Sequence, residues 1–180
     1  LAGSSGMVIA EQWGFKTMQE SGADKTWMQE CMVPHWVRGG KDEAGIISFQ
    51  STANGVGKSK MERKLEVIAL GNSLGTGPKG IIDNVVLVNS FEELEAKKDL
   101  VNGKIVFYDY KFNPAFVNTF VAYSDAVQYR VYGAGRAAKY GAIAVIVRSM
   151  SHGTDNKPHT GLVTYDSAYT RIPAVAIGAQ

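Results

Sequence analysis

Apolar residues recur along the first part of the chain at the spacing of a helix. They are separated by three or four positions and therefore gather on one face of an α-helix. The helix is expected to begin after Ser4 or Ser5, either of which can cap it, and to end near Ser21. The apolar stripe consists of Met7, Ala10, Trp13, Gly14 and Met18.

Residues 26–33 are rich in strand formers and predict a strand after this helix. Cys31 lies in the middle of that run, where we expect a buried structural thiol, and as the single cysteine it forms no disulfide within the chain. Residues 38–44 are then polar and glycine-rich. We place a domain boundary there, which divides the chain into residues 1–38 and residues 39–180.

The remainder of the chain is a succession of short apolar runs separated by turns of Gly, Pro and Asn, a pattern typical of strands. The run at 143–147 is apolar at every position, as in a strand buried on both faces. The predicted strands cover residues 46–49, 65–70, 81–88, 104–108 and 143–147, with a last strand after Pro173 and a turn at Asn54-Gly55.

Two helices interrupt these strands. Ser90 and Glu93 have the spacing of a capping box at the start of a helix over residues 91–100. A longer helix over residues 124–140 carries apolar residues on one face and is closed by Gly141. The chain is therefore predicted to be mixed α/β and rich in β structure, with strands and helices in a compact layered arrangement.

Composition and charge exclude several classes of protein. With 45% hydrophobic and 20% charged residues, the chain has the composition of an ordinary globular protein. The net charge is +2 and no long basic run occurs, so we expect no nucleic-acid partner. The longest fully apolar stretch, residues 142–147, is far shorter than the ~20 residues of a membrane span. No membrane-spanning segment is expected.

Motifs for phosphate, nucleotide or covalent chemistry are incomplete. Residues 57–59 read Gly-Lys-Ser but lack the preceding glycine of a phosphate-binding loop, because Thr52 stands at that position. Gly133 and Gly135 lie inside a predicted helix rather than at a strand-to-helix turn, so no dinucleotide fingerprint is present. A serine nucleophile elbow does not occur. A small independent hydrolase or nucleotide binder is therefore disfavoured.

Histidines offer little for a metal site. His152, Asp155 and His159 share one loop that could bind an adventitious ion, but no second cluster completes a catalytic centre. We therefore expect no catalytic residue and no native metal ligand in this chain.

Three residues remain as candidates for lining a cleft. Tyr129 and Arg130 lie on the long helix away from parts of its apolar stripe, although helix solubility explains them equally well. His159 follows Pro158 in a turn that presents an imidazole and a hydroxyl, although it could equally fasten the loop to the backbone. Tyr129, Arg130 and His159 are thus the predicted binding residues.

Several stretches of the chain together resemble one family of enzymes. Their order and spacing span nearly the whole sequence, although single pieces such as Gly-Lys-Ile-Val are common. The stretches occupy residues 1–4, 33–39, 70–76, 103–106, 127–130, 133–142, 147–149, 158–161 and 172–174. In these segments the chain resembles the carboxypeptidase Q family and its bacterial relatives.

The resemblance implies a secreted or otherwise extracytoplasmic exopeptidase with two zinc ions, in which a protease-associated domain is inserted near the start of the catalytic domain. Such a domain is of the swivelling β/β/α type, with a short-stranded sheet or open barrel and flanking helices. Residues 39–180 match the insert, and residues 1–38 match the helix and strand of the peptidase domain. The family's zinc-binding His-x-Asp and Asp-Asp motifs are absent here, so the chain resembles an excised, non-catalytic fragment.

The implied role of the insert is to shape substrate access or to bind partners. Its implied partners are the catalytic peptidase domain of the same polypeptide and a peptide substrate, whose carboxylate Arg130 could receive. The rival hypothesis is a stand-alone protein-interaction module with no catalytic partner. If the stripe that includes Met7, Trp13 and Met18 normally packs on an absent domain, the isolated chain should self-associate through its first helix.

Overall fold

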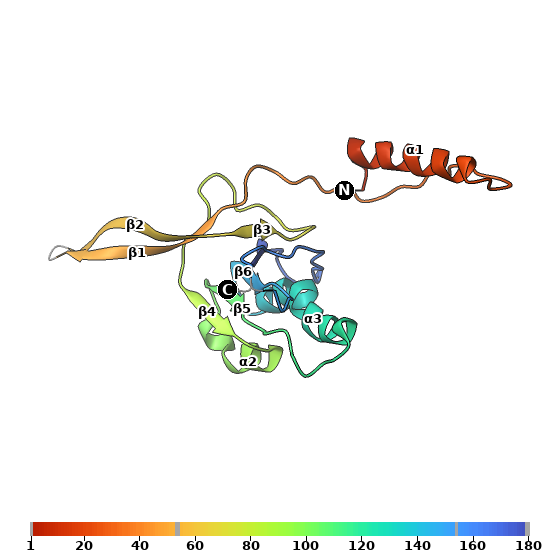
Figure 1. Cartoon of the computed structure of the whole chain (residues 1–180). Coiled ribbons are helices and arrows are strands. Elements are labelled where there is room, and N and C mark those ends of the chain that lie inside the picture. The colour runs from red at the N-terminus through yellow and green to blue at the C-terminus, as the bar shows by residue number, and fades with distance from the viewer. Residues whose placement is uncertain (1, 53–54, 154, 179–180) are drawn as a thin grey trace. The chain divides into compact units, whose positions relative to one another are not determined.

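The computed structural model describes residues 2–52, 55–153 and 155–178. The chain divides into two compact units, residues 1–39 and residues 40–180, whose elements are labelled in Figure 1. The division lies one residue after the boundary drawn from composition. That the first unit belongs to a peptidase domain stays a prediction.

The first unit contains the helix α1, which spans Ser5–Glu20 as the apolar spacing predicts. Ser4 is its N-cap, and the Ser4 hydroxyl accepts a 3.2 Å hydrogen bond from the backbone N–H of Met7. None of its residues is buried, and Trp13 is 70% exposed. Packing within the first unit therefore leaves the apolar stripe of α1 in contact with solvent.

The strand predicted at residues 26–33 is wrong. This segment is extended but forms no strand in the part of the chain that the structure describes. A strand requires a hydrogen-bonded neighbour, which a local run of strand-forming residues cannot supply. The buried thiol expected at Cys31 is wrong for the same reason, since Cys31 is exposed.

The second unit holds two sheets in the described residues. The antiparallel pair of β1 (Ala44–Thr52) and β2 (Gly55–Leu65) is one, and the other has the strand order β3-β7-β6-β5-β4. Its members are β3 (Val67–Ala69), β4 (Val85–Val88), β5 (Ile105–Tyr108), β6 (Ala144–Arg148) and β7 (Ala174–Ile177). Strands β4 to β7 are parallel, and β3 pairs with β7 in the antiparallel sense.

The predicted strands are largely confirmed, with shifted ends. Of residues 81–88 only the second half, β4, pairs with a neighbour. The first strand is longer than predicted because it pairs with β2 over its whole length, from Ala44 opposite Leu65 to Thr52 opposite Gly55. Asn54, in the predicted turn between them, lies outside the described residues. A mixed α/β fold is confirmed.

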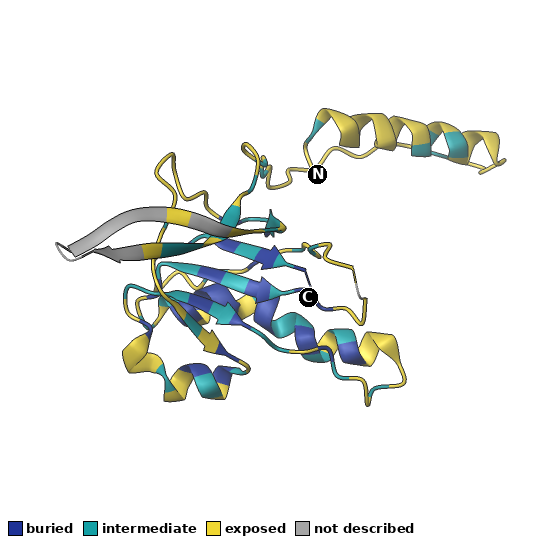
Figure 2. Ribbon diagram, turned by 60° about the vertical axis from the view of Figure 1, so that its left-hand side comes forward, coloured by how far each residue is buried: buried dark blue, intermediate teal, exposed yellow. Residues whose placement is uncertain are grey.

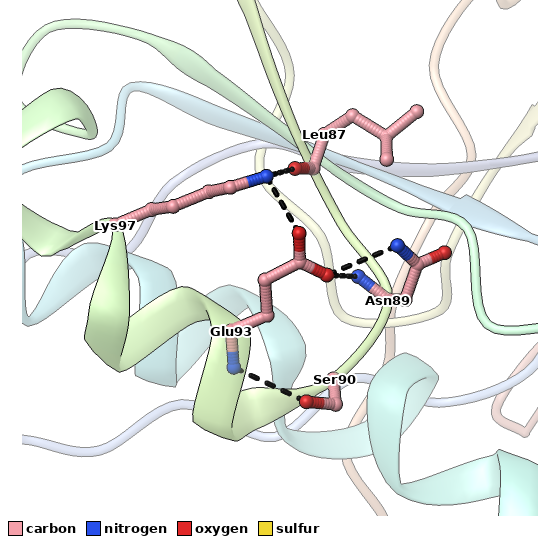
Figure 3. A network of polar contacts seen from close by, with 5 residues as sticks. All are labelled: Leu87, Asn89, Ser90, Glu93 and Lys97. Atoms are coloured by element: carbon pink, nitrogen blue, oxygen red, sulfur yellow. Dashed lines mark hydrogen bonds and ion pairs between the residues drawn. The ribbon is translucent and has the colours of Figure 1, made fainter.

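Helix α2 spans Phe91–Ala96 and is followed by the 3-10 turn η1 (Lys98–Leu100). The Ser90 hydroxyl caps it by accepting a 3.1 Å hydrogen bond from the Glu93 N–H. In a capping box the carboxylate of Glu93 would accept a hydrogen bond from the N–H of the N-cap residue, Ser90. Here it accepts instead from the backbone N–H of Asn89, one residue earlier, at 2.6 Å (Figure 3). The Lys97 ammonium donates one hydrogen bond to the same carboxylate and another to the Leu87 carbonyl.

Helix α3 spans Thr119–Ala138 and so begins five residues before the predicted start. Asn118 is its cap and accepts a 2.9 Å hydrogen bond from the Phe120 N–H. The core lies between α2, α3 and one face of the five-stranded sheet. There the Tyr108 hydroxyl donates a 2.9 Å hydrogen bond to the Gly133 carbonyl.

Among the described residues of the second unit, no helix lies on the other face of this sheet. The chain passes from β4 through α2 to β5 and then through α3 to β6, moving across the sheet in one direction. Because such crossovers are right-handed, α2 and α3 lie on the same face of the sheet. Along β5, β6 and β7 buried residues alternate with half-buried ones, as the colours in Figure 2 show. The less buried face is mainly apolar and carries Val85, Leu87, Ile105, Phe107, Ala144, Ile146, Val175 and Ile177. Its one charged residue among the described strands is Arg148 at the end of β6, which pairs with Asp109 at 2.8 Å.

Candidate functional site

Arg130 and His159 come together where α3 meets the loop that follows β6. The Arg130 Nη2 donates a 2.8 Å hydrogen bond to the Tyr123 hydroxyl, and its Nη1 donates to the Thr160 carbonyl at 3.3 Å. The same Nη1 lies 3.5 Å from His159 Nδ1. Tyr123 also lies under the guanidinium, with 5.5 Å from Cζ to the ring centroid. Thus two of the three predicted residues share one site.

The guanidinium of Arg130 is buried and only partly satisfied. The residue is 8% exposed, and its Nε has no hydrogen-bond partner. No carboxylate of the described residues lies within ion-pair distance of it. A buried cation without a counter-ion is costly, so this charge favours an anion nearby.

Gly161 allows the loop to pass over Arg130. A β-carbon at this position would lie 2.3 Å from Arg130 Cζ, which is far inside van der Waals contact. The backbone here is fixed from the opposite side, because the Gly161 carbonyl accepts a 2.7 Å hydrogen bond from the Gly71 N–H. The loop and the arginine are therefore packed as one unit.

His159 is exposed and held by its own backbone. Its N–H donates a 2.7 Å hydrogen bond to the Ser149 hydroxyl, which in turn donates to the Ile177 carbonyl. Partial burial lowers the pKa of the His159 imidazole, and the nearby charge of Arg130 lowers it further. The lowered pKa favours the neutral imidazole, and the tautomer with an unprotonated Nδ1 can accept a hydrogen bond from Arg130.

Tyr129 does not join this site. It is 5% exposed and stacks on Tyr110, with 4.5 Å between the ring centroids, beside Phe91. The expectation that Tyr129 lines a surface or cleft is therefore wrong. The ring of a tyrosine is large and apolar and is readily buried, although its hydroxyl is polar.

Tyr123 is the site residue that the sequence analysis missed. The helix predicted from the sequence begins only at residue 124 and so excludes Tyr123. Once α3 begins at Thr119, Tyr123 and Arg130 are seven residues apart and lie on one face of the helix. The signal available in the sequence was Asn118, a residue type favoured at helix N-caps.

A zinc centre does not fit the described residues. A structural or catalytic zinc needs three or four protein ligands, and no group of three or more His, Cys, Asp or Glu side chains gathers within residues 2–52, 55–153 and 155–178. His152 instead lies edge-on against Phe112, with 4.5 Å between the ring centroids. The site of Arg130 and His159 can attract an anion, but the described residues do not supply a set of zinc ligands.

The fold and the site define a mostly parallel sheet backed by helices, with a buried arginine beside an exposed histidine. No protein-family model matches the chain. The sequence is 34% identical to human carboxypeptidase Q and 33% identical to that of Xenopus laevis, over all 180 residues in each case. These alignments cover 34% of each relative. The chain is homologous to carboxypeptidase Q and spans about a third of its length.

A solved structure agrees with this relationship. The crystal structure of a peptidase M28 precursor from Shewanella amazonensis matches 99% of the chain with a TM-score of 0.83 and 30% sequence identity. The match covers 38% of that protein. The mixed α/β fold of this chain is therefore one that occurs within an M28 peptidase. Among the described residues, no helix is long and apolar enough to cross a membrane.

Proposed function

We propose that this chain is the non-catalytic, protease-associated part of a secreted, zinc-dependent exopeptidase, where it shapes the access of peptide substrates. The observation that carries the proposal is the alignment with carboxypeptidase Q, which covers the whole chain but only 34% of the relative. The zinc ions and the catalytic residues belong to the remainder of such an enzyme. Residues 39–180 form the inserted domain, and residues 1–38 belong to the peptidase domain.

Two apolar surfaces support a partner within the same polypeptide. Sheets with parallel strands are normally covered on both faces, yet one face of this sheet has no helix, and Leu87 on it is 43% exposed. In the first unit, Trp13 and Met32 are 70% and 99% exposed. Each surface is of the kind that becomes buried against another domain. The catalytic peptidase domain is the proposed partner of both.

The cationic site supports a role in substrate access. Arg130 supplies a positive charge that forms no ion pair with a described carboxylate, and its Nη1 lies 3.5 Å from Nδ1 of the exposed His159. A charge of this kind, in a poorly solvated place, attracts the carboxylate of a short peptide toward the surface. Arg130 and His159 thus act as positioning residues, which raise the local concentration of substrate but take no part in bond cleavage.

The test uses the complete reading frame that contains this sequence, assayed on a panel of dipeptides. We expect hydrolysis that a zinc chelator abolishes, and an increase of KM of about tenfold with little change in kcat for Arg130→Gln. Arg130→Lys, which keeps the charge, should recover part of the loss. Arg171→Gln, at an exposed arginine of the same unit, is the matched control and should leave KM unchanged.

Two results would contradict the proposal. One is a complete protein without peptidase activity, which would favour the alternative of a stand-alone interaction module. The other is an unchanged kcat/KM after residues 40–180 are replaced by a short flexible linker, because the domain would then have no influence on substrate access.

A further inference from the structure

A cavity of about 570 Å³ lies between α2, α3 and the loop of residues 164–169. Its volume falls within the range of small-molecule sites, about 300–1,000 Å³. Aromatic rings form much of its wall, contributed by Phe91, Tyr132, Tyr140, Tyr165 and Tyr169. The cavity shares no lining residue with the site of Arg130 and His159.

The wall of this cavity is preformed. The Thr164 N–H donates a 2.8 Å hydrogen bond to the Val131 carbonyl, which fixes the loop on α3. The loop also packs against Gly135, where a β-carbon would lie in ordinary van der Waals contact, 3.5 Å from the Thr164 oxygen. Within the loop, the Tyr165 hydroxyl donates a 2.5 Å hydrogen bond to the Ile172 carbonyl. A ligand would therefore meet a shaped surface rather than have to order a loose one.

The carboxylates in the wall already have partners. The Glu95 carboxylate accepts a hydrogen bond from the Tyr140 hydroxyl and pairs with Lys98 at 3.4 Å. The Asp166 side chain accepts a 2.8 Å hydrogen bond from the Ala168 N–H and so holds its own turn. Both carboxylates keep their negative charge, but in the described part of the chain neither forms an ion pair with Arg136 or Lys139.

The cations in the wall lie on aromatic rings instead. The Arg136 Cζ lies 4.0 Å from the centroid of the Phe91 ring, and the Lys139 Nζ lies 4.9 Å from that of Tyr140. Neither cation is within ion-pair distance of a carboxylate in the described part of the chain, and Glu92 influences Arg136 only at longer range. A guanidinium stacked on a ring keeps its in-plane N–H groups free for a bidentate carboxylate.

We propose that this cavity binds a carboxylate carried on an aromatic or apolar body. Arg136 receives the carboxylate through two parallel hydrogen bonds, Lys139 adds a second positive charge, and the rings of Tyr132 and Tyr169 enclose the body. Such a ligand is either the free C-terminal residue of a peptide or an acidic side chain next to an aromatic one. The site is a second binding function, separate from the influence of Arg130 on substrate access.

The experiment titrates the ¹⁵N-labelled chain with 3-phenylpropionate and follows the backbone amide signals. We expect saturable shifts confined to the residues that line the cavity, within residues 91–95, 132–140 and 164–169. The neutral isostere 3-phenylpropanamide should bind about tenfold more weakly, because a hydrogen bond to a charged group is lost. N-acetylphenylalanine and acetyl-Glu-Tyr-amide then distinguish the two sources, since tighter binding of the first indicates a chain terminus and of the second an acidic side chain.

Matched variants make the result specific. Arg136→Gln should weaken 3-phenylpropionate about tenfold, whereas Arg38→Gln should change nothing, although Arg38 also lies over a ring, that of Trp36. Should Arg136→Gln fail to fold, Lys139→Gln and the isostere pair carry the test. The proposal is overturned if no saturable shift occurs at millimolar ligand, if the amide binds as well as the carboxylate, or if a folded Arg136→Gln keeps its affinity.

Discussion

Gly161 lies so close to Arg130 that the space between them admits no side chain. A β-carbon at Gly161 would lie 2.5 Å from Arg130 Nε, the atom that has no hydrogen-bond partner. The glycine and the arginine therefore fix each other, and the loop that carries His159 depends on both.

The first prediction follows from this packing. Gly161→Ala should lower the free energy of unfolding by about 1–3 kcal/mol, because either the loop or the buried guanidinium has to move. Gly75→Ala is the control, since open space surrounds Gly75. Urea denaturation measures both variants. Equal stability of the two would show that the loop yields without cost and that the contact is not a constraint.

The second prediction concerns the imidazole of His159. Burial and the charge of Arg130 both lower its pKa, so the folded state resists protonation and loses stability as the pH falls below the ordinary histidine value. Arg130→Gln should raise the His159 pKa toward that value, and the dependence of stability on acidic pH should weaken. Histidine ring signals followed by NMR report the shift directly, with exposed His35 as internal reference. An unchanged His159 titration would mean that the two groups are not electrically coupled.

The third prediction concerns the start of α2, drawn in Figure 3. Hydrogen bonds from Lys97 and Asn89 lower the pKa of Glu93 to about 2. The stabilisation by this carboxylate is thus complete above its unfolded pKa of about 4.5 and is lost as the pH falls toward 2. Wild type and Glu93→Gln should differ in thermal stability at neutral pH and converge near pH 2. Asp99→Asn serves as the control, and a gap that persists at low pH would point to a structural effect of the substitution.

The N-cap of the same helix gives a second stability value for comparison. Ser90→Ala should cost about 1 kcal/mol at neutral pH, because the Glu93 N–H loses its acceptor. Because Ser90 also lowers the pKa of Glu92, thermal unfolding at neutral pH is the measurement that isolates the cap.

The fourth prediction concerns the apolar surface of the first unit. With Trp13 and Met18 70% and 52% exposed on α1, the isolated chain should self-associate, and its sedimentation coefficient should rise with concentration. The double variant Trp13→Lys, Met18→Lys should remove this dependence. A monomer at all concentrations, with slow hydrogen exchange in α1, would show that the helix is covered within one chain.

The strands and helices of the second unit were largely predictable, because their signals are local. Alternation, capping residues and closing glycines mark β5, α2 and the end of α3. The segment at 26–33 has the same local signals and still forms no strand. A segment becomes a strand only if another strand lies beside it, and its own residues do not show whether one does.

The candidate site was predictable only in part. Arg130 and His159 could be identified from the sequence by their side-chain chemistry. That they lie side by side depends on the loop after β6, which packs against α3. Tyr129 was misplaced because the helix face that meets the sheet is set by Tyr108 and Gly133, whose contact is a tertiary one. The uncovered apolar face of the sheet cannot be recognised from the sequence, because its residues resemble those of any buried strand.

The measurement that tests the central claim most directly is a calorimetric zinc titration of the chelator-treated chain, combined with an assay on a small panel of dipeptides. A non-catalytic domain should take up no stoichiometric zinc and release no amino acid. Tight binding of one or two equivalents, lost in His152→Ala or His159→Ala, would instead make the loop between β6 and β7 a metal site and contradict the account.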